Sequence, residues 1–270
     1  MGFSVLMSVY QKEKPEYLRE ALQSVIHQSM VPQEIVLMQD GRLTDGLYQV
    51  IDETKREYPG FKTFEIAENG GLGRALAKGV GLCENELIAR MDTDDIAVPD
   101  RFACQYGYMM EHPQVAVTGG FMEEFDEQDA SCCRLKTMPE QMPEIRKYAR
   151  YRNPLNHMTV MFRKENILKA GNYRHFPYLE DYDLWSRMLA RGEQFYNIQQ
   201  VFVRARTSRE LYARRGGGSY CRQYLKLRKQ QYEEGLLGFG EYQIARILTV
   251  GMTVQPSRLR KEVYQKILRK

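Results

Sequence analysis

Three carboxylates lie within four residues in the segment ELIARMDTDDIAVPDRF, residues 86–102. Asp92, Asp94 and Asp95 follow a short apolar run, and like charges this close repel each other unless a cation neutralises them. Two carboxylates one residue apart can both reach one hard cation, and Mg²⁺ or Mn²⁺ takes oxygen ligands while it keeps phosphate oxygens in its shell. The alternative is a solvated acidic turn, in which Asp95 or Asp100 caps the next helix. The position after an apolar run favours a metal–diphosphate site.

A second acidic group lies in YLEDYDLWSRML, residues 178–189. If a helix begins near Leu179, Asp181 shares one face with Trp185 and with two other apolar side chains. Burial on that face would raise the pKa of Asp181, as a general base needs. Trp185 is the only tryptophan, and its flat ring could stack on a sugar. The alternative is that Glu180 and Asp181 only cap the helix, with Trp185 in the core.

Strands and helices must bring these acids together, and the sequence of the first half of the chain predicts those strands and helices clearly. Apolar runs predict strands at 3–9, 34–39, 61–67 and 86–91, and helical periodicity predicts helices at 15–26, 45–58 and 72–80. This alternation predicts βαβ crossovers and a mainly parallel sheet. Ligands bind beyond the carboxyl ends of such strands. Asp40 follows the second strand and Asp92 follows the fourth, so both are expected at that edge.

The second half is less regular. We expect helices at 99–112, 139–150 and 179–191, strands at 114–125 and 157–163, and one or two short strands within 194–206. Gly119 and Gly120 predict a bulge or bend in the first of these strands. A basic loop at 204–218 precedes basic helices at 219–234 and 256–269.

The bulk composition narrows the class of protein. The 270 residues suit one large α/β domain, or such a domain with a C-terminal extension. No apolar run approaches 18 residues, so no transmembrane helix is expected. Five cysteines without a CxxC pair indicate neither a disulfide framework nor a zinc site, and a reducing cytoplasm is expected. Residues 201–270 carry 16 Lys and Arg against 5 Asp and Glu, a balance of +11, whereas the first 200 carry −7. The basic end therefore predicts an anionic partner.

Three stretches in this order resemble a known family: SVLMSVYQKEKPEYLREALQSVIHQS, EIVLMQDG and AENGGLGRALAKGVGLCENELIARMDTDD. They resemble the family 2 inverting glycosyltransferases with the GT-A fold, most of all the bacterial polysaccharide-assembly branch, over roughly residues 3–205. The resemblance implies an α/β fold with a mainly parallel, Rossmann-like sheet flanked by helices. We expect a GT-A domain at 1–205, with a nucleotide-binding half at 1–98 and an acceptor-binding half at 99–205. Residues 206–270 would then form a basic loop and helical extension.

The resemblance also implies roles for single residues. Asp40 would hold the nucleobase, Asp92 would lie near the ribose, Asp94 would bind Mn²⁺ or Mg²⁺, and Asp181 would be the catalytic base. Val9, Tyr10, Arg74 and Thr93 would complete the donor site, and Glu180, Trp185 and His157 would line the acceptor pocket. His157 could equally be an ordinary strand-end residue, and the Asn69–Arg74 segment an ordinary tight turn. The family often has two acids where this chain has Gln39-Asp40, so the base contact depends on Asp40 alone.

The predicted function is metal-dependent inverting transfer of a sugar from a nucleotide-sugar donor, a UDP-sugar by family frequency. The acceptor would be a glycan or a polyprenyl-linked glycan, and no nucleic-acid partner is expected. The protein would lie in the cytoplasm, and its basic end would meet the inner face of an anionic membrane or close over the diphosphate. Two other functions compete: a Mg²⁺-dependent phosphatase with Asp92 as nucleophile, and a non-catalytic sugar-nucleotide or glycan-binding protein. An aspartyl phosphatase usually has its acids after the first strand, not the fourth.

Overall fold

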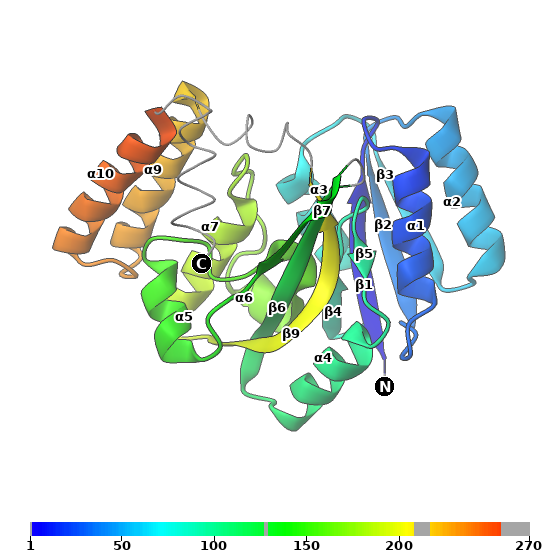
Figure 1. Ribbon diagram of the computed structural model, residues 1–270, viewed down its shortest axis with the longest axis horizontal. Helices are drawn as coiled ribbons and strands as arrows, with labels where there is room; N and C mark the ends of the chain where they lie inside the picture. The colour runs from blue at the N-terminus through cyan, green and yellow to red at the C-terminus, as the bar shows by residue number, and fades with distance from the viewer. Residues whose placement is uncertain (1, 127–128, 208–216, 255–270) are drawn as a thin grey trace.

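The computed structural model describes residues 2–126, 129–207 and 217–254 (Figure 1). Its strands form one sheet in the order β3-β2-β1-β4-β8-β6-β9-β5, with β7 paired to β6. The strands are β1 (Phe3–Val9), β2 (Glu34–Asp40), β3 (Phe61–Ile66), β4 (Leu87–Arg90), β5 (Ile96–Ala97), β6 (Val115–Asp126), β7 (Asp129–Lys136), β8 (Met161–Arg163) and β9 (Gln194–Arg206). The first four pair in parallel, as do β6 and β9, whereas β8 pairs antiparallel with β4 and β6.

Helices cover both faces of this sheet. They are α1 (Pro15–Ile26), α2 (Asp45–Glu57), α3 (Leu72–Leu82), α4 (Arg101–Glu111), α5 (Met142–Ala149), α6 (Lys164–Lys169), α7 (Glu180–Ala190), α9 (Gly218–Glu233) and α10 (Phe239–Val254). One core joins the sheet to α1, α2 and α4, and a second core joins the other face to α3, α5, α6 and α7. The helices α9 and α10 lie side by side at the end of the molecule away from α1 and α2 (Figure 1). Among the described helices, none has the length and apolar character needed to cross a membrane.

The strand β1 shows why the first half of the chain was predictable. Val5 and Met7 point into one core and Leu6 into the other, so a continuous apolar run is buried on both faces. The helix α1 buries Leu18 and its neighbours one turn apart, and Pro15 occupies its first turn, where no backbone N–H is needed. The predicted α/β fold with a mainly parallel sheet is confirmed.

The second half differs from prediction in places. Residues 157–163 were expected to form one strand, but His157–Thr159 form a short 3-10 helix, η1, and only 161–163 join the sheet. The Thr159 hydroxyl donates to the Asn156 carbonyl oxygen at 2.8 Å, and such local bonds compete with strand pairing. The strand β6 shifts register beside Gly120, as its glycines predict, and β9 is one long strand. The helices α6 and α10 were not predicted, and the helix expected at 256–269 lies outside the described residues.

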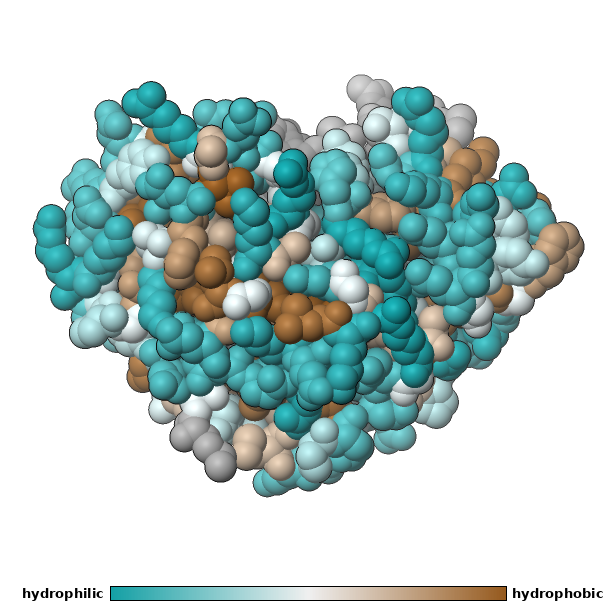
Figure 2. Space-filling view, turned by 180° about the vertical axis from the view of Figure 1, so that it is seen from behind, coloured by the Kyte–Doolittle hydropathy of each residue, from teal (hydrophilic) through white to brown (hydrophobic). Residues whose placement is uncertain are grey.

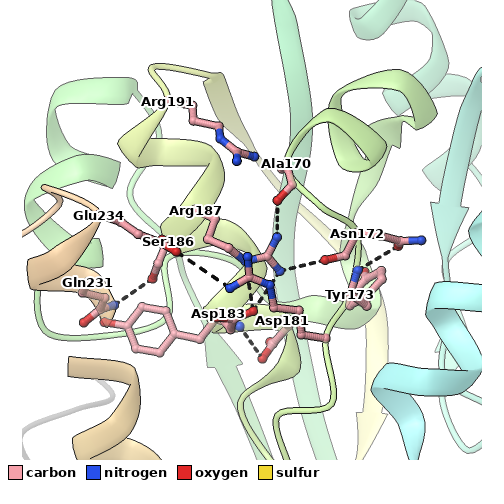
Figure 3. A network of polar contacts seen from close by, with 12 residues as sticks. Ala170, Asn172, Tyr173, Asp181, Asp183, Ser186, Arg187, Arg191, Gln231 and Glu234 are labelled. Atoms are coloured by element: carbon pink, nitrogen blue, oxygen red, sulfur yellow. Dashed lines mark hydrogen bonds and ion pairs between the residues drawn. The ribbon is translucent and has the colours of Figure 1, made fainter. Parts of the chain in front are cut away.

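A buried ion pair fixes α7 to the loop before it (Figure 3). The Arg187 guanidinium donates to one Asp183 oxygen from Nε and Nη2, at 3.0 and 2.8 Å. It also donates to the carbonyl oxygens of Ala170 and Asn172, so its charge is well bonded although the side chain is buried. Asn172 has a left-handed backbone, with φ of 58°. The network therefore holds the turn that leads to Tyr173 in place.

We expect Asp183→Ala to lower the free energy of unfolding by about 3–5 kcal/mol, because it leaves the buried Arg187 charge without its carboxylate. Urea denaturation followed by far-UV circular dichroism would measure the loss. The matched control is Glu165→Ala, which removes an ion pair to Lys169 with the same i, i+4 spacing but about two-thirds exposed. That change should cost about 0.3–0.5 kcal/mol. Equal losses in the two variants would contradict the assigned importance of burial.

A second buried arginine attaches α9 to the base of α7. The Arg228 guanidinium donates to the Tyr182 hydroxyl oxygen at 2.9 Å and to the carbonyl oxygens of Arg150 and Tyr151 at 3.0 and 2.6 Å. Gln231 donates from Nε2 to the Ser186 hydroxyl oxygen at 2.7 Å (Figure 3). The α9–α10 pair is therefore bonded to the helix that begins with the Glu180-Asp181 pair.

Candidate functional site

The carboxyl ends of β1, β2 and β4 meet at the upper edge of the sheet in Figure 1. In the view from behind, the outline of the molecule is indented at this edge, between two lobes (Figure 2). The residues predicted to bind a ligand come from the loops that leave these strand ends and from the start of α7. They fall into two acidic groups, with a buried guanidinium between them.

The first acidic group follows β4. One carboxylate oxygen of each of Asp92, Asp94 and Asp95 lies within 4.8 Å of the others. Glu13 adjoins the group, because the Thr93 hydroxyl donates to its Oε2 at 2.9 Å. Burial, with the charges of Asp92 and Glu13, raises the pKa of Asp94 to about 7. Burial and the two neighbouring aspartates raise the pKa of Asp95 well above its usual range.

These raised pKa values bear on whether a cation fits the group. Burial, and then the neighbouring carboxylates, disfavour the ionised form of Asp94, so it binds a proton more readily than a free carboxyl does. A divalent ion would replace that proton, and the donor set consists of carboxylate oxygens, which Mg²⁺ and Mn²⁺ prefer. Asp95 is buried and accepts the Arg206 backbone N–H at 3.0 Å, whereas Asp92 and Asp94 are partly exposed. The residues present therefore fit such an ion, with Asp94 and Asp92 on the open side.

Arg90, the last residue of β4, lies between the two acidic groups and was not singled out from the sequence. Its side chain is only 2% exposed, and its Nη2 donates to Asp92 Oδ1. Its Nε and Nη1 have no hydrogen-bond partner within the described chain. The Arg90 charge lowers the pKa of Asp94 and of Asp181, so it acts on both groups. Arg101 lies beneath it and donates to the Arg90 carbonyl oxygen at 2.7 Å. An arginine at the end of a buried strand was the one sequence signal for this role.

The second acidic group is Glu180 and Asp181 at the start of α7. Asp181 accepts a hydrogen bond from Asn153 Nδ2 at 2.5 Å and one from the Tyr182 backbone N–H at 2.7 Å. Burial raises the pKa of Asp181, although these two bonds and the Arg90 charge lower it. Burial and the neighbouring Asp181 charge raise the pKa of Glu180 to about 7. The orientation of Asp181 by Asn153, which is 28 positions away, could not be read from the sequence.

Two other side chains of α7, those of Asp183 and Trp185, lie away from solvent. Asp183 is held by Arg187, so it is not available as a base. Trp185 is fully buried, and it meets the rings of His157, Tyr173 and Phe195 edge-on at 6.0–6.4 Å. This differs from the expected sugar-stacking ring, because no face of Trp185 is open to a ligand. The ring instead supports His157, whose Nε2 lies 2.9 Å from the Tyr173 hydroxyl oxygen. Burial and the Arg90 charge lower the pKa of His157 well below its usual value.

The predicted donor residue Asp40 lies at the end of β2. Asp40 is buried, and its two carboxylate oxygens accept the backbone N–H groups of Gly70 and Gly71 at 2.8 and 2.9 Å. Gly71 has φ of 85°, a backbone that glycine adopts without strain, and it is the N-cap of α3. The exposed Arg74 lies against Gly70, because a Cβ there would meet Arg74 Cδ at 3.1 Å. The tight turn is thus real, and it brings Arg74 to the edge that Asp40 occupies.

Two further predicted donor residues lie at the end of β1. The Val9 side chain is fully buried, so only its backbone can face a ligand, and Tyr10 is partly exposed. The structure therefore gathers the predicted donor residues and the Glu180-Asp181 pair along one edge of the sheet. It adds Arg90 and Asn153 to them, and it leaves Trp185 in the core.

The chain is similar in sequence to known glycosyltransferases. Residues 4–168 match the family model described as glycosyl transferase family 2. The chain is 36% identical over 264 residues to the amylovoran biosynthesis glycosyltransferase AmsE of Erwinia amylovora, with 98% of both chains covered. It is 35% identical over 268 residues to the UDP-Gal:alpha-D-GlcNAc-diphosphoundecaprenol beta-1,3-galactosyltransferase of Escherichia coli, with 99% of this chain and 97% of that protein covered.

Solved structures agree with the fold. The S. aureus TarS fragment 1–349 in complex with UDP-GlcNAc superposes with a TM-score of 0.71 at 15% identity, over 99% of this chain and 76% of that one. The mannosyltransferase PcManGT of Pyrobaculum calidifontis, solved with GDP-Man and Mn²⁺, gives a TM-score of 0.68 at 14% identity, over 98% and 75%. At such identities the likeness concerns the fold alone, and it confirms the expected GT-A fold.

Proposed function

The chain belongs to glycosyltransferase family 2, and we propose that it is a metal-dependent inverting transferase that takes a sugar from a UDP-sugar and passes it to a glycan or polyprenyl-linked acceptor. One observation carries the site assignment. A group that fits a divalent cation and a group that contains a buried, oriented carboxylate lie at the same sheet edge, and the Arg90 charge acts on both. Sugar transfer from a nucleoside diphosphate needs both functions: charge neutralisation on the leaving group and a base for the acceptor.

The donor half would bind the nucleotide diphosphate. Asp40 would contact the nucleobase and Arg74 the phosphates, while Asp94, with Asp92, would hold the cation. When bound, Mg²⁺ or Mn²⁺ supplies positive charge that stabilises the leaving diphosphate. Arg90 positions Asp92 through its hydrogen bond to Oδ1. Because Arg90 also lies close to Asp94, it offsets part of the negative charge that the diphosphate adds.

The acceptor half would supply the base. Asp181 removes the proton from an acceptor hydroxyl, and that oxygen attacks the anomeric carbon from the face opposite the diphosphate. The bond from the anomeric carbon to the diphosphate oxygen breaks as the new glycosidic bond forms, so the configuration inverts. The proton ends on Asp181 and the electron pair on the diphosphate. The raised pKa of Asp181 makes it a stronger base, and Asn153 and the Tyr182 N–H fix its direction.

The names of the two sequence relatives support a choice of donor and acceptor. The Escherichia coli relative is named as a UDP-Gal-dependent enzyme acting on a diphosphoundecaprenol-linked GlcNAc, and the Erwinia relative is named for biosynthesis of amylovoran. Both cover nearly the whole chain, so we propose a UDP-sugar donor and a lipid-linked acceptor here, used at the cytoplasmic face of a membrane. The basic balance of +11 after residue 200 fits such an anionic surface.

The test is a thermal-shift screen of nucleotides and nucleotide sugars, with and without Mn²⁺, followed by a UDP-release assay. We expect UDP and one UDP-sugar to raise the melting temperature in a Mn²⁺-dependent way, and GDP to have little effect. A ligand at 100 times its Kd stabilises by about 2.7 kcal/mol, which such a screen detects readily. Binding without turnover across a broad panel of acceptors would indicate a binding protein. An aspartyl-phosphate trapped on Asp92 would indicate a phosphatase.

A further inference from the structure

The helix α10 buries small and hydroxyl side chains and exposes aliphatic ones, which is the reverse of the usual pattern for a surface helix. Ala245, Thr249 and Thr253 recur every four residues and are buried. The aliphatic side chains of Ile244, Ile247, Leu248 and Val250 are exposed, and Ile247 reaches 72%. We call these four residues the outer face of α10. A helix on a water-soluble surface normally buries its aliphatic stripe and exposes polar residues.

The buried face of α10, formed by Ala245, Thr249 and Thr253, packs closely on α9, so small and hydroxyl side chains fill the space between the two helices. The Arg228 Nε donates to the Thr249 hydroxyl oxygen at 3.4 Å, and the Thr253 hydroxyl donates to the Thr249 carbonyl oxygen at 2.7 Å. The aliphatic outer face therefore contributes nothing to this packing. Figure 2 shows apolar residues at the outer edge of the lobe that α9 and α10 form. Four neighbouring aliphatic residues on one helix indicate a surface that meets a non-aqueous partner.

Charge decides which partner fits the outer face of α10. Residues 217–254 carry five Lys and Arg against three Asp and Glu, and residues 255–270, which lie outside the described chain, carry six against one. A second copy of this chain would bring like charge to the same surface, and so would residues 255–270 folded back on α10. An anionic bilayer instead offers acyl chains to the aliphatic residues and phosphates to the exposed basic residues of the same two helices, which are Arg222, Lys226, Lys229 and Arg246.

We propose that the outer face of α10 docks on an anionic lipid bilayer, with the aliphatic side chains inserted at the headgroup boundary. This deepens the proposed function and rests on it in one respect, namely that the acceptor is lipid-linked. The α9–α10 pair is bonded through Arg228 to Tyr182, the neighbour of Asp181. Docking of α10 would therefore hold the acceptor half, rather than the α1–α2 side, next to the lipid surface.

Vesicle co-sedimentation of the full chain tests the proposal. We expect binding to vesicles of phosphatidylcholine mixed with phosphatidylglycerol, weak binding to pure phosphatidylcholine, and weakening by salt. The double variant Ile247→Gln, Leu248→Gln keeps the charge and should lower the partition coefficient on the anionic vesicles by about tenfold or more. The matched control is Val31→Gln, Leu168→Gln, which changes two half-exposed aliphatic residues elsewhere and should bind as the wild type does.

A fluorescence probe separates the remaining outcomes. In Ile247→Trp the natural Trp185 is fully buried, so a blue shift on vesicle addition reports the new indole. An indole already blue-shifted without lipid would mean that the chain covers the outer face itself, and would overturn the proposal. So would unchanged vesicle binding in the double variant, or a dimer seen by light scattering that this variant dissociates. Mn²⁺-dependent UDP binding should stay normal in all α10 variants, so failure of docking is distinguishable from failure of the transferase assignment.

Discussion

Asp181→Asn is expected to lower kcat by about 10²–10⁴-fold while the donor still binds with nearly normal affinity. The change keeps the size of the side chain and removes its proton acceptor, and the base acts on the acceptor, not on the diphosphate. The amide can still accept the Tyr182 N–H hydrogen bond, so the start of α7 should be kept. Steady-state UDP release gives kcat, and titration calorimetry gives donor affinity. Donor hydrolysis by water should fall as well if the same carboxylate activates that water.

The control variant is Glu180→Gln, because the structure leaves Glu180 as the other candidate base on α7. Glu180 has a raised pKa of about 7, whereas Asp183 is held by Arg187. We expect Glu180→Gln to act chiefly on the KM of the acceptor. Wild-type turnover in Asp181→Asn together with an inactive Glu180→Gln would move the base by one residue. Activity in both variants would mean that the pair only caps the helix.

Asp94→Ala is expected to abolish Mn²⁺-dependent nucleotide binding, because the cation loses one of the two partly exposed carboxylates of the cluster. Calorimetry with UDP, with and without Mn²⁺, measures the effect without any turnover. In the wild type, metal affinity should fall as the pH falls below about 7, where protons occupy Asp94 and compete with the ion.

The matched control for this experiment is Asp100→Asn. Asp100 is an exposed acid that follows β5 in the chain, outside the cluster of Asp92, Asp94 and Asp95. Its loss should leave Mn²⁺-dependent UDP affinity unchanged. If Asp94→Ala binds UDP with Mn²⁺ as tightly as the wild type does, Asp94 is not the metal ligand.

The sequence predicted those parts of the fold in which local pattern and tertiary structure agree. The first four strands and their helices were found because buried parallel strands are apolar throughout and crossover helices show one apolar face. Asp40 and Asp94 were placed at one edge for the same reason, since strand ends of a parallel sheet meet. The helix α10 was missed because its aliphatic residues face outward, so its pattern is not that of a packed helix.

Other features depend on contacts between distant residues, which no local pattern contains. Asn153 reaches Asp181 across 28 positions, and Arg90 serves two acidic groups that lie about 90 residues apart in the chain. Trp185 was expected to face a sugar because it is one turn from Asp181. Two residues on one helix face are near each other, but this does not determine which of them is exposed. The Trp185 ring lies within the hydrophobic core.

The buried charges at the end of β4 have a consequence for the lifetime of the protein in the cell. Raised pKa values mean that the folded chain disfavours the ionised forms of Asp94 and Asp95, so the free energy of unfolding falls as the pH rises from the ordinary carboxyl pKa through these raised values. The sheet and its two cores must offset that loss. A cation and a donor would relieve it, so the ligand-bound chain is the more stable one. Unfolded chains are the ones that proteases remove. We therefore expect the chain to be more resistant to proteolysis when Mn²⁺ and the proposed donor are bound than when they are absent.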